Sequence, residues 1–233
     1  MNPLARAIMG TAAGAALSPL AGAIAIMDAR SGVTDVSGFC SAWADQSGTG
    51  SNATQSTAGL RPQIISSHAA FGGAAALYFN ASYFSWAIST ASKSHTFYFV
   101  VDQASVGAWQ RYFDTATGRY LIEKSDASGN VRYFDGTTYY SPGTATTGAQ
   151  VMCVTADATA PSVQFYRNNA AFGSALTYSG GGRAIGGTTV LGASNSGALP
   201  LVAYVAAVFV YPTAHSTGDR THMHNYITQE WGI

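Results

Sequence analysis

Charged side chains are scarce in this sequence and make up only 9% of its 233 residues. Soluble domains usually carry about 25% charged residues. Eleven basic and eleven acidic residues balance to a formal net charge of zero. A protein that binds nucleic acid needs a basic surplus to contact phosphates, so the composition argues against that partner. A nearly neutral surface also gives little protection against self-association, and we therefore expect an oligomer or a larger assembly.

Cysteine is almost absent. The two cysteines, Cys40 and Cys153, form no C-x-x-C pair and no spacing with histidine that is typical of a zinc site. A disulfide between them stays open, but two separately buried thiols are favoured because free cysteine is among the most buried residue types.

Glutamate is also rare, and its scarcity bears on catalysis. A glycosidase needs two carboxylates that flank the scissile bond, whereas the two glutamates, Glu123 and Glu230, stand in no such arrangement. Asp102, Asp114 and Asp135 are not paired on one strand, and no G-x-S-x-G motif offers a serine nucleophile. The sequence predicts a protein that is not an enzyme.

No uninterrupted hydrophobic run is suited to crossing a membrane. Residues 1–27 are mostly apolar, but Thr11, Ser18 and Pro19 interrupt them. A secretory signal with cleavage near Ala23 is one interpretation. We favour another, in which residues 1–20 form an apolar arm that docks on its own domain or on a neighbour. Residues 21–233 then form one domain.

Apolar residues are plentiful at 47%, and aromatic residues reach 12%. Short β-branched and aromatic runs recur between glycine-rich turns, which is typical of an antiparallel sandwich. The expected strands are 21–27, 75–79, 95–101, 112–114, 119–123, 131–134, 151–155, 162–167, 188–192 and 203–211. The last of these is apolar on both faces, so we expect it at the centre of a sheet.

One C-terminal helix is expected. Ser216 or Thr217 can cap its start, Asp219 lies in its first turn, and Gly232 ends it. Met223, Tyr226, Ile227 and Trp231 then form one apolar stripe, which we expect to pack against a sheet.

Several segments resemble the LamG-like, concanavalin A-like jelly-roll family. The most specific segment is Ser41–Gln55 followed by Leu60–Ile64, which resembles the family's W-x-D-x-S-G-x-G-x-x-A-T-Q…R-P pattern. Three later segments fit in order, and together they extend the resemblance over residues 21–233: Leu77–Phe84, Val163–Asn169, and Val202–Tyr211 with Trp231-Gly232-Ile233. Thr49, Tyr78 and Asn80 depart from the usual pattern. The resemblance implies an all-β, two-sheet antiparallel jelly roll, of a kind found in phage virion proteins and secreted bacterial proteins.

The first of these segments has a structural interpretation. Gly48 and Gly50 permit positive φ, Asp45 and Ser47 can accept bonds from backbone amides, and Trp43 serves as a core anchor. We expect the whole set to form a structural turn rather than a binding site: Trp43, Asp45, Ser47, Gly48, Gly50, Asn52 and Gln55.

Metal ligands are not indicated. His222 and His224 are two residues apart on the expected helix, so with His215 they make a poor chelating set. A calcium ion would need several converging oxygens. Four residues could supply oxygens to a structural calcium ion: Asp45, Asn52, Asp126 and Asn130. The calcium site stays unassigned. We expect no other cofactor.

Sugar binding is the best-motivated activity, because aromatic rings stack on sugar rings and such recognition needs no net charge. The candidate platforms lie in or near turns: Trp86, Trp109, Tyr112, Tyr139 and Tyr140. Burial of these rings in the core is the competing interpretation.

Together these features predict a non-catalytic component of a virion surface, such as a phage decoration, head-fibre or tail-associated protein. Its sandwich would bind a host glycan, and its arm would contact capsid or tail proteins and sister subunits. A secreted bacterial lectin-like adhesion module and a purely structural capsid-stabilising protein are alternatives. A glycoside hydrolase is less favoured.

Overall fold

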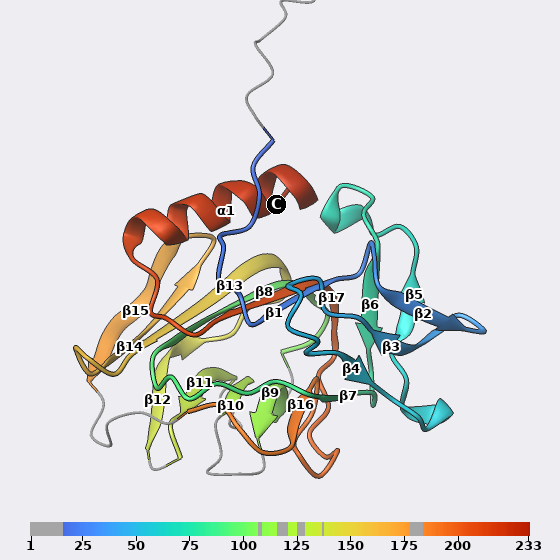
Figure 1. Ribbon diagram of the computed structural model, residues 1–233, viewed down its shortest axis with the longest axis horizontal. Helices are drawn as coiled ribbons and strands as arrows, with labels where there is room; N and C mark the ends of the chain where they lie inside the picture. Colours follow the sequence, from blue (N-terminus) through green and yellow to red (C-terminus); the bar gives the residue numbers. More distant parts are fainter. Residues whose placement is uncertain (1–15, 107–108, 116–120, 125–128, 137, 178–183) are drawn as a thin grey trace, which may run out of the picture.

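The computed structural model describes residues 16–106, 109–115, 121–124, 129–136, 138–177 and 184–233. These residues form the predicted antiparallel β-sandwich with one C-terminal helix (Figure 1). Two stacked layers of strands, called here the back layer and the front layer, enclose the main core.

The back layer consists of six antiparallel strands. In spatial order they are β1 (Ala25–Asp28), β17 (Ala203–Tyr211), β8 (His95–Gln103), β13 (Gly148–Asp157), β14 (Ser162–Arg167) and β15 (Ala170–Thr177). β17 is central, because β8 pairs with one of its edges, and β1 and β6 pair with the other. The prediction that the apolar C-terminal strand lies inside a sheet is confirmed.

The front layer also has six strands. In spatial order they are β7 (Phe84–Trp86), β16 (Thr189–Leu191), β9 (Gln110–Thr115), β10 (Leu121–Lys124), β11 (Asn130–Phe134) and β12 (Tyr139–Thr144). At its far edge β12 runs close to β15, and Gly173 permits this approach. A Cβ at Gly173, where φ is +70°, would lie within 2.9 Å of the Pro142 backbone.

Short strands join the two layers. They are β2 (Val33–Val36), β3 (Phe39–Trp43), β4 (Ala53–Thr54), β5 (Gln63–Ile65) and β6 (Ala76–Phe79). Two 3-10 turns, Ala58–Leu60 and Ala69–Phe71, lie between them. β6 pairs with β17 and β4 pairs with β7, so the hydrogen bonding continues from the back layer into the front layer.

Two apolar clusters fill the molecule. One lies between the layers and includes Phe97 and Phe99 of β8 with Phe113 of β9. The other lies on the outer face of the back layer, where Tyr98 of β8 and Phe209 of β17 meet the helix. Residues along β8 therefore alternate between the two clusters, which is why both faces of this strand are buried.

The helix α1 (Thr217–Trp231) lies across the outer face of the back layer (Figure 1). Its predicted start is confirmed, because Ser216 and Asp219 form a reciprocal capping box. Gly232 ends the helix in the left-handed conformation, as expected. The predicted apolar stripe is buried against the sheet: Met223, Tyr226, Ile227 and Trp231. Among the described residues, no helix has the length and apolarity needed to cross a membrane.

Residues 16–20, the described part of the predicted arm, lie along α1. Leu17 and Leu20 pack against the outer cluster. The Ser18 carbonyl oxygen lies 2.8 Å from Nε2 of His222, and the Tyr211 hydroxyl donates to the Leu20 carbonyl at 3.2 Å. This segment thus docks on its own domain, whereas residues 1–15 lie outside the described part. The boundary at residue 20 stays a prediction.

The expected strands include none between residues 28 and 74, but β2 occupies Val33–Val36 and pairs with β3 as a hairpin. Ser37 and Gly38 make its tight turn with φ of 56° and 84°. The residues of β2 are largely exposed at the rim of the sandwich, so the strand lacks the alternation of buried and exposed residues that would reveal it in the sequence.

The thiols are free, as favoured. Cys40 belongs to the cluster between the layers and Cys153 to the cluster beneath the helix. Burial raises the pKa of each thiol to about 12, so both are protonated and poorly reactive at neutral pH.

Candidate functional site

The turn that follows β3 is a closed hydrogen-bonded unit around Asp45. Its Oδ1 accepts from the backbone N–H groups of Ile26 at 2.8 Å and Ser47 at 2.9 Å. Its Oδ2 accepts from the Ser47 hydroxyl at 2.7 Å and from the N–H of Ser51 at 3.2 Å. The N–H of Asp45 in turn donates to Oδ1 of Asn52 at 2.9 Å. The turn therefore ties the start of β1 to the end of β3.

The same bonds set the charge state of Asp45. Partial burial acts to raise the pKa of this carboxyl, but the hydrogen bonds from Ile26 and Ser47 outweigh it, and the pKa lies below its usual value. Gly48 and Gly50 adopt φ of 86° and 79°, as expected. The hydrogen bonds of Asp45 and the positive φ angles of the two glycines make this turn a structural unit of the fold.

Gln55 and Trp43 complete the unit from inside. The Gln55 side chain donates to the Tyr83 carbonyl at 2.9 Å and accepts from the Thr57 N–H at 3.0 Å. Trp43 is fully buried, and its indole N–H donates to the Asp28 carbonyl at 2.9 Å. Trp43 is therefore the predicted core anchor.

Three of the predicted sugar platforms are buried, so that prediction is wrong for them. Trp86 is 2% exposed, and its indole N–H donates to the Ser51 carbonyl at 2.7 Å. Tyr112 is 2% exposed and bonds Gln103. Tyr140 is 6% exposed. Each side chain points from the front layer into the core, where no ring face remains for a sugar.

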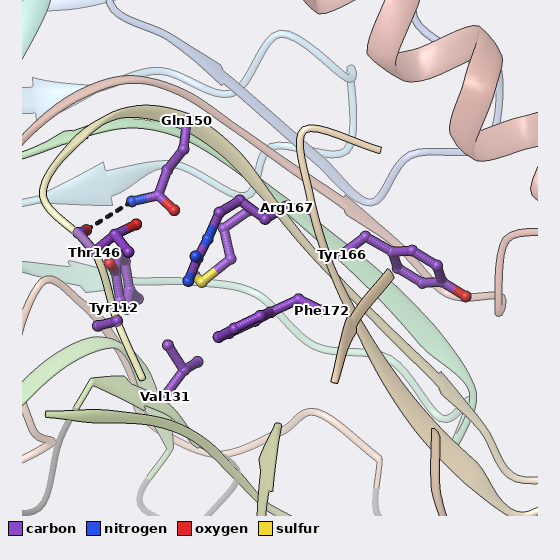
Figure 2. A pocket seen from close by; sticks show the side chains of 9 residues that line it. Tyr112, Val131, Thr146, Gln150, Tyr166, Arg167 and Phe172 are labelled. Carbon is purple, nitrogen blue, oxygen red and sulfur yellow. Dashed lines mark hydrogen bonds between the residues drawn. The ribbon is translucent and has the colours of Figure 1, made fainter. Parts of the chain in front are cut away.

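Tyr112 forms part of the wall of a small cavity between the two layers (Figure 2). The guanidinium of Arg167 lies over the ring of Phe172 at 4.0 Å and donates to the Thr144 carbonyl at 3.1 Å. The cavity volume is about 10 Å³, which is room for about one water molecule. This cavity is too small to hold a sugar.

The other two predicted platforms, Trp109 and Tyr139, are exposed. Trp109 is 41% exposed and precedes β9, and Tyr139 is 44% exposed and begins β12. Between them lies Arg132 of β11, whose guanidinium carbon is 5.9 Å from the Trp109 ring centre and 5.4 Å from the Tyr139 ring centre. The ring of Phe134 lies 4.5 Å from that of Tyr139. We call these four residues the aromatic surface.

The backbone holds Trp109 in an unusual conformation, with φ of 56°. A bulky residue rarely adopts positive φ, and such strain costs on the order of 1–3 kcal/mol. Strained residues persist where the surrounding structure fixes them, often at binding sites. Trp109 is therefore a locally strained residue at the start of β9.

Sequence reasoning missed Arg132 and Phe134. Along β11, Val131 and Tyr133 are buried while Arg132 and Phe134 are only half-buried, the alternation of a strand with one inner and one outer face. The same rule separates adjacent residues in β12, where Tyr139 points outward and Tyr140 inward. Period-two alternation was the signal that could have found both.

The aspartates considered for catalysis serve structural roles. Asp114 is buried and accepts from Arg111 at 2.6 Å and from the Asn195 N–H at 2.9 Å. Asp135 accepts from the Tyr140 hydroxyl at 3.0 Å. Asp102 lies on the back layer, 2.8 Å from Nε2 of His68. Each of these carboxylates is engaged by a neighbouring side chain.

The histidines do not converge. His215 is buried with Nδ1 2.8 Å from the Tyr98 hydroxyl, and His222 contacts the Ser18 carbonyl. Within the described part of the chain, no group of three or more histidine, cysteine or acidic residues could hold a metal ion. Of the four calcium candidates, the Asp45 carboxylate and the Asn52 side-chain oxygen accept internal hydrogen bonds, Asn130 lies on β11, and Asp126 is outside the described residues.

Comparison with known proteins identifies the fold. No protein-family model matches the sequence, and no curated protein matches it significantly. Among solved structures, domain 4 of AbnA, a GH43 extracellular arabinanase from Geobacillus stearothermophilus solved in complex with arabinotriose, has a TM-score of 0.62 at 13% identity. That match covers 88% of this chain and 98% of the other.

Two further structures are similar. The binding domain of Paraclostridial Mosquitocidal Protein 1 has a TM-score of 0.61 at 12% identity. The match covers 88% of this chain, and this chain spans about half (52%) of the length of that one. Trypanosoma rangeli sialidase has a TM-score of 0.62 at 14% identity over 97% of this chain and 36% of that one. Identities this low show a common fold alone. The chain is an all-β, concanavalin A-like sandwich with one C-terminal helix.

Proposed function

We propose that this protein is a non-catalytic carbohydrate-binding module and that the aromatic surface is where it holds a glycan. The observation that carries the proposal is the pair of exposed rings, Trp109 and Tyr139, on either side of Arg132. Large aromatic side chains usually bury most of their surface, so two exposed rings that share one cation form an uncommon arrangement.

The chemistry of the aromatic surface suits a sugar. A sugar ring presents an apolar face of C–H groups, which packs on an aromatic ring, and a rim of hydroxyl groups. The planar guanidinium of Arg132 is a hydrogen-bond donor that suits those hydroxyl oxygens. Phe134 packs against Tyr139 and limits the orientations that the tyrosine ring can adopt. The platform is therefore partly organised before a ligand arrives.

The comparisons support the class of ligand. Domain 4 of the arabinanase has this fold and was solved with arabinotriose. It is one domain of a larger enzyme, which fits a binding role for the fold. A glycoside hydrolase is less favoured, because Asp102, Asp114 and Asp135 are each engaged by a neighbouring side chain.

We also propose that the module lies on the surface of a virion and is attached there through its N-terminal arm. The low charge of the chain and the docking of residues 16–20 on α1 support it. Docking of this short segment fixes the point from which residues 1–15 can reach a capsid, tail or sister subunit. A secreted adhesion module and a capsid-stabilising protein remain the alternatives.

A glycan array tests the binding role. Wild-type protein, Trp109→Ala and Tyr139→Ala are compared on immobilised neutral and acidic glycans, with Phe39→Ala as the matched control, because Phe39 is also 44% exposed but lies on the β2–β3 hairpin. We expect each platform variant to lose at least about tenfold in affinity, equivalent to about 1.4 kcal/mol. Phe39→Ala should bind as the wild type does. Equal binding by all four proteins, or no binding to any glycan, would overturn the proposal.

The attachment is tested by deletion of residues 1–15, which keeps the docked segment 16–20 and so leaves the cluster beneath the helix covered. We expect the shortened protein to fold and to bind glycan normally but to be missing from purified particles. Full incorporation of the shortened protein would contradict the arm's role. Recovery of a mature chain that begins after Ala23 or Ala25 would favour the secreted alternative.

A further inference from the structure

A polar groove lies on the outer face of the back layer, beside the start of α1. Strands β13, β14 and β15 supply its floor and one wall, and the residues around the N-terminus of α1 supply the other wall. Its volume is about 430 Å³, within the range of about 300–1,000 Å³ that is usual for small-molecule sites. We call it the helix-start groove.

The helix-start groove continues into a second hollow of about 400 Å³. The two share Asp157 and Ala214 in their walls, and the second extends toward Ser92 and Ser94, which precede β8. An elongated depression of this kind fits a chain of linked units better than a single compact molecule.

Its charges balance. Asp157 and Arg220 supply one charge of each sign, and the remaining polar side chains include Thr155, Ser162 and Gln164. His215 also lines the groove, and burial lowers its pKa to about 4, so its ring is neutral at pH 7. The groove thus offers hydroxyl and amide groups and one ionic group of each sign to an uncharged ligand rich in hydroxyl groups.

The acidic group is held in place. Oδ1 of Asp157 accepts from the N–H groups of Thr159 at 2.8 Å and Ala160 at 3.2 Å. These bonds fix the plane of the carboxylate. Its other oxygen, Oδ2, has no hydrogen-bond partner among the described residues, and it remains available to a ligand hydroxyl.

The basic group is equally fixed. Arg220 donates from Nη1 to the His215 carbonyl and from Nη2 to the Thr217 hydroxyl, both at 3.0 Å. Its guanidinium lies 3.8 Å from the ring centre of Tyr166. Nε of Arg220 is buried without a partner in the described structure. Figure 2 shows Tyr166 pointing away from the other residues that line the cavity between the layers, and its side chain packs against the cluster beneath the helix. Groups fixed in this way lose little freedom when a ligand binds.

We propose that the helix-start groove is a second carbohydrate site, for an uncharged oligosaccharide of at least two sugar units. The class of ligand rests on the proposed function of the aromatic surface. The aromatic surface faces outward from the front layer and the groove faces outward from the back layer, so the two sites lie on opposite sides of the sandwich (Figure 1). A single chain then binds two glycans at once.

The test measures how many oligosaccharides bind to one protein chain. Ala175 of β15 is exposed and lines the groove, so Ala175→Leu fills the groove without removing any side-chain hydrogen bond. Ala171→Leu is the matched control, since Ala171 is exposed on the same strand but is not part of the groove wall. A second variant, Asp157→Asn, keeps the acceptor for Thr159 and Ala160 and replaces the free oxygen with a donor.

Each protein is titrated with arabinotriose, maltotriose, cellotriose and chitotriose, and binding is followed through backbone amide NMR shifts. For at least one of these sugars we expect two binding events in the wild type and in Ala171→Leu. Ala175→Leu should keep only the event at the aromatic surface, and Tyr139→Ala only the event at the groove. Asp157→Asn should weaken the groove event at least tenfold.

The outcomes separate the two proposals. A single event, lost in Tyr139→Ala and unchanged in Ala175→Leu, would overturn the second site and leave the proposed function intact. A single event at the groove would overturn the aromatic surface as a site. No shift with any of the four sugars at millimolar concentration would overturn the second site, and the glycan array would decide the first independently.

Discussion

The turn around Asp45 and the aromatic surface contain similar residues but differ in what those residues contact. In the turn, the Trp43 ring is fully buried and the Asp45 carboxylate is surrounded by donors from its own chain. On the aromatic surface, Trp109 and Tyr139 keep large parts of their rings open to solvent. A tryptophan and polar neighbours in a turn therefore indicate a ligand site only where the fold leaves their contacts unused.

The two regions should also differ in whether their side chains contribute to stability or to ligand binding. Groups whose contacts are satisfied internally stabilise the fold, and their removal is costly. Groups that stay exposed to solvent contribute little to the stability of the fold, and their removal lowers the affinity for the ligand. Substitutions in the two regions should therefore act on different measurements.

The largest effect is expected for Trp43→Ala. Loss of this ring leaves a cavity between the layers and removes the bond to the Asp28 carbonyl, so we expect a loss of about 3–5 kcal/mol in the free energy of unfolding. Urea unfolding followed by circular dichroism measures it. The folded fraction should still bind glycan with wild-type affinity. A loss below about 1 kcal/mol in the free energy of unfolding would contradict the role of Trp43 as a buried residue that stabilises the fold, in contrast to the exposed Trp109.

A smaller effect is expected for Asp45→Asn, at about 2 kcal/mol near pH 7, because hydrogen bonds to a charged acceptor are worth about 1.5–3 kcal/mol. The pKa of Asp45 is lowered in the folded protein, so its contribution is fully present above the unfolded pKa of about 3.9 and is lost as pH falls through the folded value. The stability gap between wild type and variant should therefore be constant from pH 5 to 8 and narrow below pH 4. A gap that widens in acid would contradict the role of the ionised carboxylate.

The smallest effect on stability is expected for Trp109→Gly. Glycine adopts positive φ without strain, so the free energy of unfolding should stay level or rise by up to about 1 kcal/mol. Glycan affinity should fall at least tenfold in the same protein. Thermal unfolding and the array measure the two quantities. A clear loss of stability would show that the Trp109 ring supports the fold.

Local signals in the sequence predicted the parts of the fold that depend on local chemistry. Ser216, Asp219 and Gly232 carry the start and end of α1 in their own side chains and backbone preferences. The continuous apolar run of β17 predicts burial on both faces. In contrast, β15 was missed because its alanine, glycine and serine residues carry no strand pattern. Its pairing with β14 defines it.

The candidate site was only partly predictable for the same reason. The burial of Trp86 comes from β4 and β16, which are distant in sequence and pair with β7 on either side. No property of the residues next to Trp86 indicates this. The outward position of Tyr139 and the inward position of Tyr140 follow from strand alternation once the strand is recognised. The meeting of Trp109 with Arg132 depends on how three strands of the front layer are placed.

Indole N–H signals in an NMR titration test the account most directly, because the chain has four tryptophans in distinct surroundings. The N–H groups of Trp43 and Trp86 donate to backbone carbonyls inside the fold, Trp231 is buried between the end of α1 and the sheet, and Trp109 is 41% exposed. On addition of a glycan bound on the array, we expect the Trp109 signal to shift while the signals of Trp43 and Trp86 stay in place. Saturated binding that leaves the Trp109 signal unmoved would contradict the assignment of the aromatic surface as the glycan site.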